Sequence, residues 1–329
     1  MSQIYSLKKL LPVGAAVKPI FLSDKDPHSR LLKNQFTSIV AENIMKPMFI
    51  EPEPGKFIFS LTDQMIEFAH KNNMDIRWHT LCWHNQTPSW MFIGKDGKIA
   101  TKEEAKSNLK NFIQTVVSHN KDKSIESYDV VNECISDTTF NLRNGSEHSL
   151  WYQIIGPEYI DLAFTWAHEA DPNATLIIND YNLESVKEKR AAMINLIKDM
   201  KNKNVPIDGV GIQMHISLCN PSLQVIKETI EEFAALNIKV YITEMDMSLF
   251  EWEDKTLTIP KEKLPVLLEL QAIRYKELFT LFKSEMDAGK LQKVILWGVD
   301  DTTSWKNNFP VNGRTDYALC FDRDLHLKL

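Results

Sequence analysis

The chain has 329 residues, of which 43% are hydrophobic and 25% are charged, a balance typical of a soluble protein with enough apolar material for a large core. Its net charge of −6 argues against a polyanionic partner such as nucleic acid or an anionic membrane surface. No stretch approaches the roughly 18 consecutive apolar residues of a membrane span.

Eight short runs rich in β-branched residues are predicted to form strands. Several of them, such as 239–244 and 293–298, are apolar almost throughout, as expected of parallel strands that are covered on both faces. In chain order the predicted strands are Val13–Val17, Ser38–Glu42, Asp75–His79, Ser127–Asn132, Thr175–Asn179, Gly209–His215, Lys239–Glu244 and Lys293–Gly298.

The segments between these runs have the apolar spacing of helices. Thr101 and Glu104 predict a capping box at the start of one helix, and Ser222 predicts the N-cap of another. A long helix is expected within 261–286, and the basic run Lys187–Arg190 is expected to be a solvated helix face. The apolar stripes are interpreted as packing faces; they are Leu61, Met65, Phe68 and Ala69; Leu109, Phe112, Ile113, Val116 and Val117; and Ile226, Ile230 and Phe233.

Strands that alternate with helices over the whole length predict an α/β fold, a (β/α)8 TIM barrel. No long linker or low-complexity tract interrupts the chain, so a single domain over 1–329 is expected. Two connections, at 134–156 and 247–260, are longer than the rest. Both follow strands that carry a candidate glutamate, so both are expected to form walls of a cleft.

Cysteine usage and the N-terminus bear on the cellular compartment. Residues 1–11 lack the apolar length and the small-residue cleavage site of a secretory signal, so we expect a cytoplasmic protein, or a secreted one whose leader has been removed. No CxxC spacing is present, so small buried side chains are expected rather than disulfides or metal ligands at Cys82, Cys134, Cys219 and Cys320.

Polar and aromatic residues stand at the carboxyl ends of the predicted strands, where the chemistry of such a barrel takes place. Any one of them is explained by the border between a strand and a loop, but their number favours a site. They are Glu42, Asn43, His79, Trp83, Asn132, Glu133, Asp180, Tyr181, Gln213, His215, Glu244, Asp246 and Trp297.

Glu133 and Glu244 are the candidate catalytic pair. Glu133 follows the apolar run 128–131, a setting that tends to raise the pKa of a carboxyl and that suits an acid/base. Glu244 has His215 and Asp246 as expected neighbours, which would hold it ionised as a nucleophile. A structural ion pair is an equally good explanation of either glutamate taken alone.

Other kinds of chemistry find less support in the sequence. His79, His84 and His215 form no HxH or HExxH cluster, so a metal site is not expected. The chain has no GxSxG, GxGxxG or Walker A motif, so no nucleophilic serine and no nucleotide cofactor is expected. Eight tryptophans supply flat apolar faces of the kind that stack on a pyranose ring, although a lone tryptophan is usually core.

The sequence resembles glycoside hydrolase family 10, the endo-β-1,4-xylanases, over nearly its full length. The similarity is closest to the intracellular bacterial branch, notably in residues 83–88 and 308–314. The segments that carry it, in this order, are Glu42–Lys46, Trp78–Trp90, Asp129–Glu133, Asn179–Asn182, Gly211–His215, Ile242–Asp246 and Trp297–Gly298 followed by Trp305.

The resemblance implies roles for individual residues. Glu133 would be the acid/base, Glu244 the nucleophile, and His215 would bridge Glu244 and Asp246. Tyr181 would stack on the leaving-group side. The remaining sugar contacts would be made before the scissile bond by Asn132, Lys46, His79, Trp83 and Gln213, in the next subsite by Glu42, Asn43 and Gln86, and on the non-reducing side by Trp297 and Trp305.

Several positions depart from the family pattern. Pro47, Met48 and Phe49 follow Lys46 where an aromatic and an acidic residue are usual, which affects the outer subsites. Leu183 stands where the family often has glutamate, which affects one leaving-group contact.

The expected activity is retaining hydrolysis of internal β-1,4 bonds in xylan or xylooligosaccharides, without a metal or cofactor. Retention requires the two carboxyls to lie about 5–5.5 Å apart. The alternatives are a β-1,4-glucan hydrolase of the same fold, a metal-dependent barrel hydrolase and a non-catalytic sugar-binding barrel. The last is disfavoured because both glutamates are present. The sequence does not predict the oligomeric state.

Overall fold

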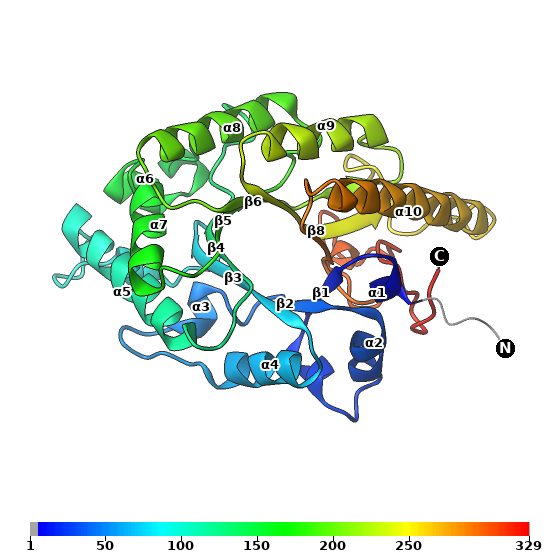
Figure 1. Ribbon diagram of the computed structural model, residues 1–329, viewed down its shortest axis with the longest axis horizontal. Helices are drawn as coiled ribbons and strands as arrows, with labels where there is room; N and C mark the ends of the chain where they lie inside the picture. Colours follow the sequence, from blue (N-terminus) through cyan, green and yellow to red (C-terminus); the bar gives the residue numbers. More distant parts are fainter. Residues whose placement is uncertain (1–5, 329) are drawn as a thin grey trace. The chain divides into compact units, whose positions relative to one another are not determined.

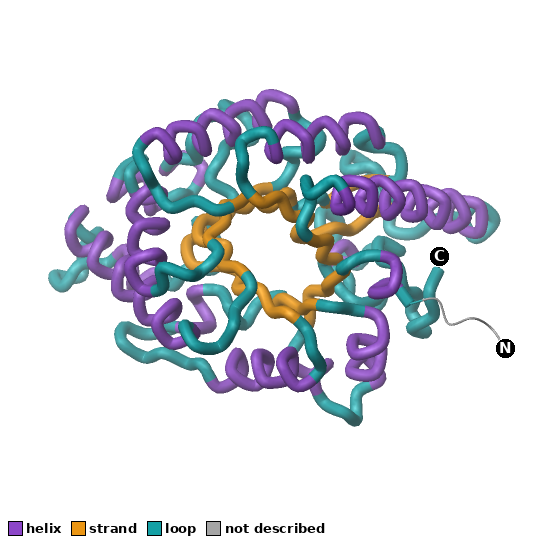
Figure 2. Tube along the Cα trace, viewed as in Figure 1, coloured by secondary structure: helices purple, strands orange, loops and turns teal. Residues whose placement is uncertain are grey.

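The computed structural model describes residues 6–328, which divide into two compact units. One unit comprises 1–42 and 212–329, and the other comprises 43–211. The expectations for the first five residues lie outside the described part of the chain. Each unit alternates strands with helices, and Figure 2 shows that within each unit the helices lie along one face of the strands.

The unit formed by 1–42 and 212–329 contains five strands in the order β2-β1-β9-β8-β7. Strand β1 pairs in parallel with β2 and β9, and β8 pairs in parallel with β7 and β9. The strands are β1 (Val13–Val17), β2 (Ser38–Ala41), β7 (His215–Ser217), β8 (Lys239–Ser248) and β9 (Lys293–Leu296). The helices are α1 (Leu7–Leu10), α2 (Pro27–Gln35), α9 (Leu223–Ala234) and α10 (Leu264–Asp287).

The unit formed by 43–211 contains the strand order β6-β5-β4-β3, with parallel pairing of β3 with β4 and of β4 with β5. The strands are β3 (Asp75–Trp83), β4 (Ser127–Asn132), β5 (Leu176–Asp180) and β6 (Gly209–Ile212), whose last residue belongs to the other unit. The helices are α3 (Pro47–Ile50), α4 (Ser60–Lys71), α5 (Lys102–Asn120), α6 (Leu150–Ile155), α7 (Tyr159–Ala170) and α8 (Lys187–Asn202).

Helix α5 forms where its apolar stripe predicts. Thr101 and Glu104 make the expected capping box, and the five stripe residues of this helix are completely buried. The helix packs on α7, beside which it lies in Figure 1. Because burying one such side chain contributes about 1.5–3 kcal/mol, this stripe is a main reason that α5 stays on the strands. Ser222 also caps α9 as predicted.

Three strand boundaries differ from the prediction in ways that affect the site. Strand β3 continues past His79 to Trp83, so His79 lies within the strand. The run 209–215 is two strands, because Met214 has a φ of 68° and interrupts the extended backbone. Glu244 lies within β8, since the strand continues to Ser248. The pairing of β8 with β9 shifts register between Ile242 and Met245, and such an irregularity re-aims the side chain beside it.

Three expectations about exposure are wrong. Leu61, which is assigned to the packing face of its helix, is 45% exposed, whereas Met65, Phe68 and Ala69 of the same stripe are buried. Cys219 is exposed, whereas the other three cysteines are buried as expected. In the run 187–190, Lys189 and Arg190 are buried, so this is not a solvated face. Lys189 is accommodated because its ammonium group contacts the carboxylates of Asp137 and Asp180.

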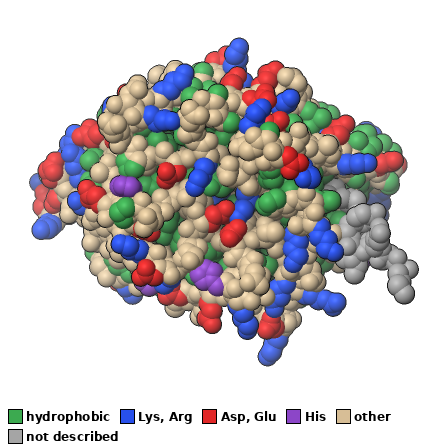
Figure 3. All heavy atoms as spheres, viewed as in Figure 1, with side chains coloured by type: hydrophobic (Ala, Val, Ile, Leu, Met, Phe, Trp, Pro, Cys, Tyr) green, Lys and Arg blue, Asp and Glu red, His purple; other side chains and the backbone are tan. Residues whose placement is uncertain are grey.

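The surface is rich in charge of both signs. On the face drawn in Figure 3, Lys and Arg side chains are interspersed with Asp and Glu side chains. Within residues 6–328, no helix has both the length and the apolar character needed to cross a bilayer.

Candidate active site

Glu244 is held in a network of charged groups in the unit formed by 1–42 and 212–329. Its side chain is 5% exposed, and its Oε2 lies 3.5 Å from His215 Nε2. The other ring nitrogen of His215, Nδ1, lies 2.9 Å from Asp246 Oδ2. The backbone N–H of Glu244 donates to the carbonyl of Gln213 at 3.0 Å. His215 therefore bridges Glu244 and Asp246, the arrangement that the family resemblance implies.

The surroundings of His215 favour its cationic form. Burial by itself would lower the pKa of His215, but the charge of Asp246 and the hydrogen bonds to Asp246 and Glu244 raise this pKa to about 9. Burial also opposes ionisation of Asp246, yet His215 and Lys306 outweigh it and lower the pKa of this aspartate. A cationic ring beside Glu244 favours the ionised carboxylate, which is the form that a nucleophile needs.

Trp305 joins the same network through its indole ring. Its Nε1 donates to Asp246 Oδ2 at 2.6 Å, and its ring centroid lies 4.9 Å from that of His215. Trp305 also packs against a buried cluster that contains Trp297. Trp297 is 8% exposed, so most of its surface is committed to the core.

The other predicted residues of this unit are Glu42 and Gln213. Glu42 follows β2, and its Oε2 lies 3.7 Å from Lys18 Nζ. The side chain of Gln213, between β6 and β7, is buried. Both residues are at strand ends, as expected.

Glu133 directly follows β4 in the unit formed by 43–211. Its φ is 57°, a left-handed conformation that is uncommon for a residue other than glycine. Its N–H donates to the carbonyl of Asn179 at 2.8 Å, and Trp83 Nε1 donates to its Oε2 at 2.8 Å. The preceding residue, Asn132, accepts a hydrogen bond from Asn179 at 2.8 Å. The backbone and the carboxyl of Glu133 are thus both held.

Three polar residues predicted to bind sugar contact one another near Trp83. Lys46 Nζ donates to Asn43 Oδ1 at 3.0 Å and to Gln86 Oε1 at 2.8 Å. The same ammonium group lies 5.0 Å from the centroid of the Trp83 ring. Lys46 is 6% exposed, so its charge is fixed in place rather than free in solvent.

His79 lies within β3 and is buried. Its Nδ1 is 2.7 Å from Asp129 Oδ2, and Arg77 Nε donates to the other oxygen of Asp129 at 3.0 Å. This contact orients the imidazole ring, because one ring nitrogen is committed to a buried carboxylate.

Tyr181 lies in a cluster of charged residues that the sequence does not predict. Its hydroxyl donates to Asp137 and accepts from Arg143 Nη2, and Lys189 Nζ lies 3.6 Å from the centroid of its ring. The basic run 187–190 contains Lys189 of this cluster, but a run of charged residues usually indicates a helix face exposed to solvent. No pattern singles out Asp137 or Arg143.

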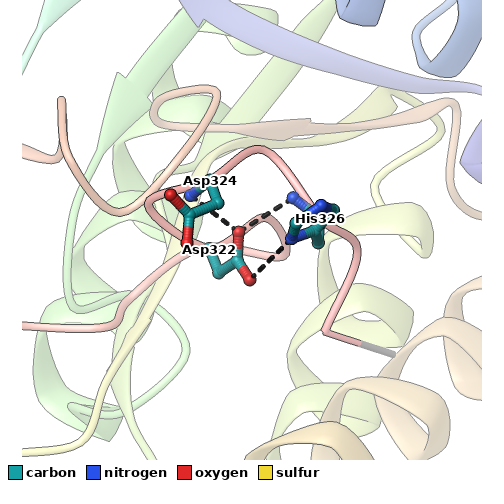
Figure 4. A group of neighbouring side chains, drawn as sticks. All are labelled: Asp322, Asp324 and His326. Carbon is teal, nitrogen blue, oxygen red and sulfur yellow. Dashed lines mark hydrogen bonds and ion pairs between the residues drawn. The ribbon is translucent and has the colours of Figure 1, made fainter.

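One group of residues in the C-terminal segment has the composition of a metal site. Ligand atoms of Asp322, Asp324 and His326 lie within 4.8 Å of one another, and Figure 4 shows the Asp322 carboxylate between the other two residues. This carboxylate already accepts the backbone N–H groups of Asp324 and His326 at 2.9 and 2.8 Å. A hydrogen-bonded turn accounts for the arrangement.

Each unit therefore brings part of the predicted site together. The predicted residues in the unit formed by 1–42 and 212–329 are Glu42, Gln213, His215, Glu244, Asp246, Trp297 and Trp305. Those in the unit formed by 43–211 are Asn43, Lys46, His79, Trp83, Gln86, Asn132, Glu133 and Tyr181.

Solved structures similar to this chain cover almost all of it. A structure of "GH10 from Paenibacillus barcinonensis" has a TM-score of 0.94 and 41% identity, and the match covers 98% of this chain and 94% of that one. TsXylA, an intracellular xylanase from Thermoanaerobacterium saccharolyticum, was solved as a glutamate-to-alanine mutant with xylotetraose; it has a TM-score of 0.88 and 39% identity, covering 99% and 97%. The (β/α)8 barrel predicted from the sequence is confirmed.

Relatives in sequence are also similar to this chain over almost all of its length. An endo-1,4-beta-xylanase of Geobacillus stearothermophilus is 39% identical over 98% of this chain and 95% of its own length. Three other relatives are much longer, and the chain spans only 27–30% of their length. The family model described as glycosyl hydrolase family 10 matches residues 2–329. The chain therefore belongs to glycosyl hydrolase family 10.

Proposed function

We propose that this protein is a retaining endo-1,4-β-xylanase and that residues 1–329 form one catalytic domain. The observation that carries the proposal is the contact between the Glu244 carboxylate and the His215 ring. Asp246 keeps this ring in its cationic form. Family membership and relatives named as xylanases at about 40% identity support the proposal.

Glu244 and Glu133 act on the same glycosidic bond by double displacement. Glu244 attacks the anomeric carbon, while Glu133 protonates the oxygen of the leaving sugar. In the second step Glu133 takes a proton from water, which displaces Glu244 from the anomeric carbon with net retention of configuration. This mechanism requires a separation of about 5–5.5 Å between the two carboxyl groups.

The other predicted residues bind the sugar chain. Lys46, His79, Trp83, Asn132 and Gln213 contact the sugar that forms the covalent intermediate, and Glu42, Asn43 and Gln86 bind the next one outward. Trp297 and Trp305 cover the non-reducing side, and Tyr181 contacts the leaving group. The fixed position of Lys46, which donates to Asn43 and Gln86, supports this assignment because hydroxyl groups of a sugar need oriented partners.

The roles of the two glutamates are tested by adding azide to alanine variants. With Glu133→Ala, the glycosyl-enzyme on Glu244 forms from an activated aryl xyloside and azide attacks it, so a β-xylosyl azide is expected. With Glu244→Ala, azide takes the place of the nucleophile, so an α-xylosyl azide is expected. Without azide, either variant should lose roughly 100-fold or more of its activity on xylotetraose. Proton NMR of the product gives the anomeric configuration.

The exposed Glu228 of α9 provides the control, and Glu228→Ala should hydrolyse like the wild type. Wild-type turnover by Glu244→Ala would refute its assignment as nucleophile. An inverted product from the wild-type protein would refute the double displacement.

We also propose that the protein acts in the cytoplasm on short xylooligosaccharides. Its similarity to TsXylA, described as an intracellular xylanase whose mutant was solved with xylotetraose, supports this location and substrate. A β-1,4-glucan hydrolase uses the same chemistry, so initial rates on xylotetraose and cellotetraose distinguish the two activities.

A further inference from the structure

The backbone on the C-terminal side of Glu133 is held by one guanidinium group. Arg143 Nε donates to the carbonyl of Glu133 at 3.1 Å, and its Nη2 donates to the carbonyl of Ile135 at 3.1 Å. The backbone N–H of Arg143 also donates to the carbonyl of Cys134 at 2.7 Å. Arg143 therefore contacts the carbonyl groups of all three residues from 133 to 135.

The conformation of Glu133 explains why this stretch needs support. Its φ of 57° is unfavourable for a residue with a side chain, and such a conformation persists only where surrounding contacts impose it. The N–H of Glu133 is bonded to Asn179, while its carbonyl is bonded to Arg143. These two bonds fix the peptide planes on both sides of the Cα atom, and hence the direction of the side chain.

Arg143 is itself fixed by its neighbours. It is 8% exposed, and its Nη2 donates to Tyr181 Oη at 3.0 Å and lies 3.4 Å from Asp137 Oδ2. Lys189 Nζ is 2.8 Å from the other oxygen of Asp137 and 2.9 Å from Asp180 Oδ1. The two cations, Arg143 and Lys189, and the two carboxylates, Asp137 and Asp180, thus compensate one another in charge beside residues 133–135.

The same cluster holds this loop from its other side. Asp180 Oδ2 accepts the N–H of Ile135 at 3.0 Å, so Ile135 is bonded through both its N–H and its carbonyl. A lysine at position 143 would keep the charge, but it would lack the planar fork that reaches two carbonyl groups at once.

We propose that Arg143 is a positioning residue for the acid/base: it sets the direction of the Glu133 carboxyl by fixing the backbone of residues 133–135. This inference rests on the proposed function, in which Glu133 protonates the leaving oxygen. Arg143 does not take part in proton transfer. Its loss leaves the acid present but misdirected.

The dependence on the leaving group separates positioning from a general structural role. Xylotetraose has a poor leaving group, which needs the proton from Glu133. The dinitrophenolate of 2,4-dinitrophenyl β-xylobioside is a good leaving group and departs without a proton. A misdirected acid therefore slows formation of the glycosyl-enzyme from xylotetraose but not from the aryl substrate. The later hydrolysis of the glycosyl-enzyme, in which Glu133 acts as base, does not enter kcat/KM. A damaged fold, a lower fraction of active protein or a displaced nucleophile slows formation of the glycosyl-enzyme from both substrates.

The experiment compares kcat/KM on these two substrates for Arg143→Lys and Arg143→Gln. We expect roughly a 10- to 100-fold loss on xylotetraose and less than about a 3-fold loss in formation of the glycosyl-enzyme from the aryl substrate. The loss should lie mainly in kcat. Because Arg143→Lys keeps the positive charge, it provides the comparison if Arg143→Gln does not fold.

Arg274→Gln is the matched control. Arg274 donates to the backbone carbonyl of Pro221, and its side chain is 13% exposed, against 10% for Arg143. We expect it to act like the wild type on both substrates. Equal losses on both substrates for folded Arg143 variants, or no loss, would overturn the inference. A wild-type protein that cleaves neither substrate would overturn the proposed function instead.

Discussion

Several residues in or next to the candidate site have left-handed backbone conformations. Gln86, Glu133, Asn182 and Met214 all have φ between 45° and 68°, and each lies at or just beyond the end of a strand. Such conformations occur where surrounding structure imposes them, often at functional sites. Residue identity does not reveal them, since only Asn182 belongs to a type that often adopts the left-handed region.

His215 should make the stability of the protein depend on pH in the alkaline range. Its pKa is about 9 in the folded chain, against about 6.5 in an unfolded one. The unfolded state therefore binds fewer protons than the folded state between these values. The stabilisation is complete below pH 6.5 and is lost as the pH rises through 9; the full difference amounts to about 3 kcal/mol.

Urea denaturation from pH 6 to pH 10 tests this expectation on the wild type and His215→Gln. The difference in unfolding free energy between the two should shrink as the pH rises. His168→Gln, at an exposed position on α7, controls for the loss of an ordinary histidine. A constant difference between wild type and His215→Gln across the range would contradict the cationic assignment.

Among the helices, α8 has a buried charged residue, Lys189, in its first turn. Lys189 is completely buried and contacts two carboxylates, while Lys187 in the same turn is exposed. Removing one partner of a buried ion pair leaves a charge without compensation. The position of α8 is therefore determined by an electrostatic contact as well as by its apolar residues.

Lys189→Met should destabilise the protein by roughly 3–5 kcal/mol, because Asp137 and Asp180 would then repel each other in a region of low solvent access. Lys187→Met is the same substitution at an exposed position of the same turn, and it should lower the free energy of unfolding by less than about 0.5 kcal/mol. Urea denaturation at neutral pH measures both. Equal effects of the two substitutions would show that the buried contact adds nothing to stability.

The elements of this chain could be predicted to the extent that local patterns determine them. The capping residues Thr101 and Ser222 act within one turn of helix, and both predictions are confirmed. The break between β6 and β7 depends on the backbone at Met214, and the burial of Lys189 depends on carboxylates 52 and 9 residues away in the sequence. A window of sequence contains neither kind of information.

At the scale of the whole molecule, the family and the barrel could be predicted because the motifs of the family recur in one order, and the candidate site residues are assigned from the same motifs. The supporting contacts could not be predicted. Trp83 donates to Glu133 from 50 residues away, and Arg143 supports the same residue from a loop without a recognisable motif. Such contacts depend on which strands become neighbours, and the identity of a residue does not record its neighbours in space.

The proposed location of the protein leads to an expectation about substrate length. Polymeric xylan does not enter the cytoplasm, so a cytoplasmic enzyme meets only short imported chains. We expect kcat/KM on xylotriose and xylotetraose to exceed the value on insoluble xylan by roughly tenfold or more, expressed per accessible bond. Product-resolved chromatography measures both. Comparable efficiency on insoluble xylan would contradict the proposed substrate.

The distribution of the cysteines allows unfolding to be followed by chemical modification of thiols. Of its four thiols, only that of Cys219 is exposed, and the other three are buried. A bulky thiol reagent therefore modifies one position on the native chain and four on the unfolded chain. The stoichiometry of modification reports how far the core has opened, and a dye attached at Cys219 leaves the three buried thiols unmodified.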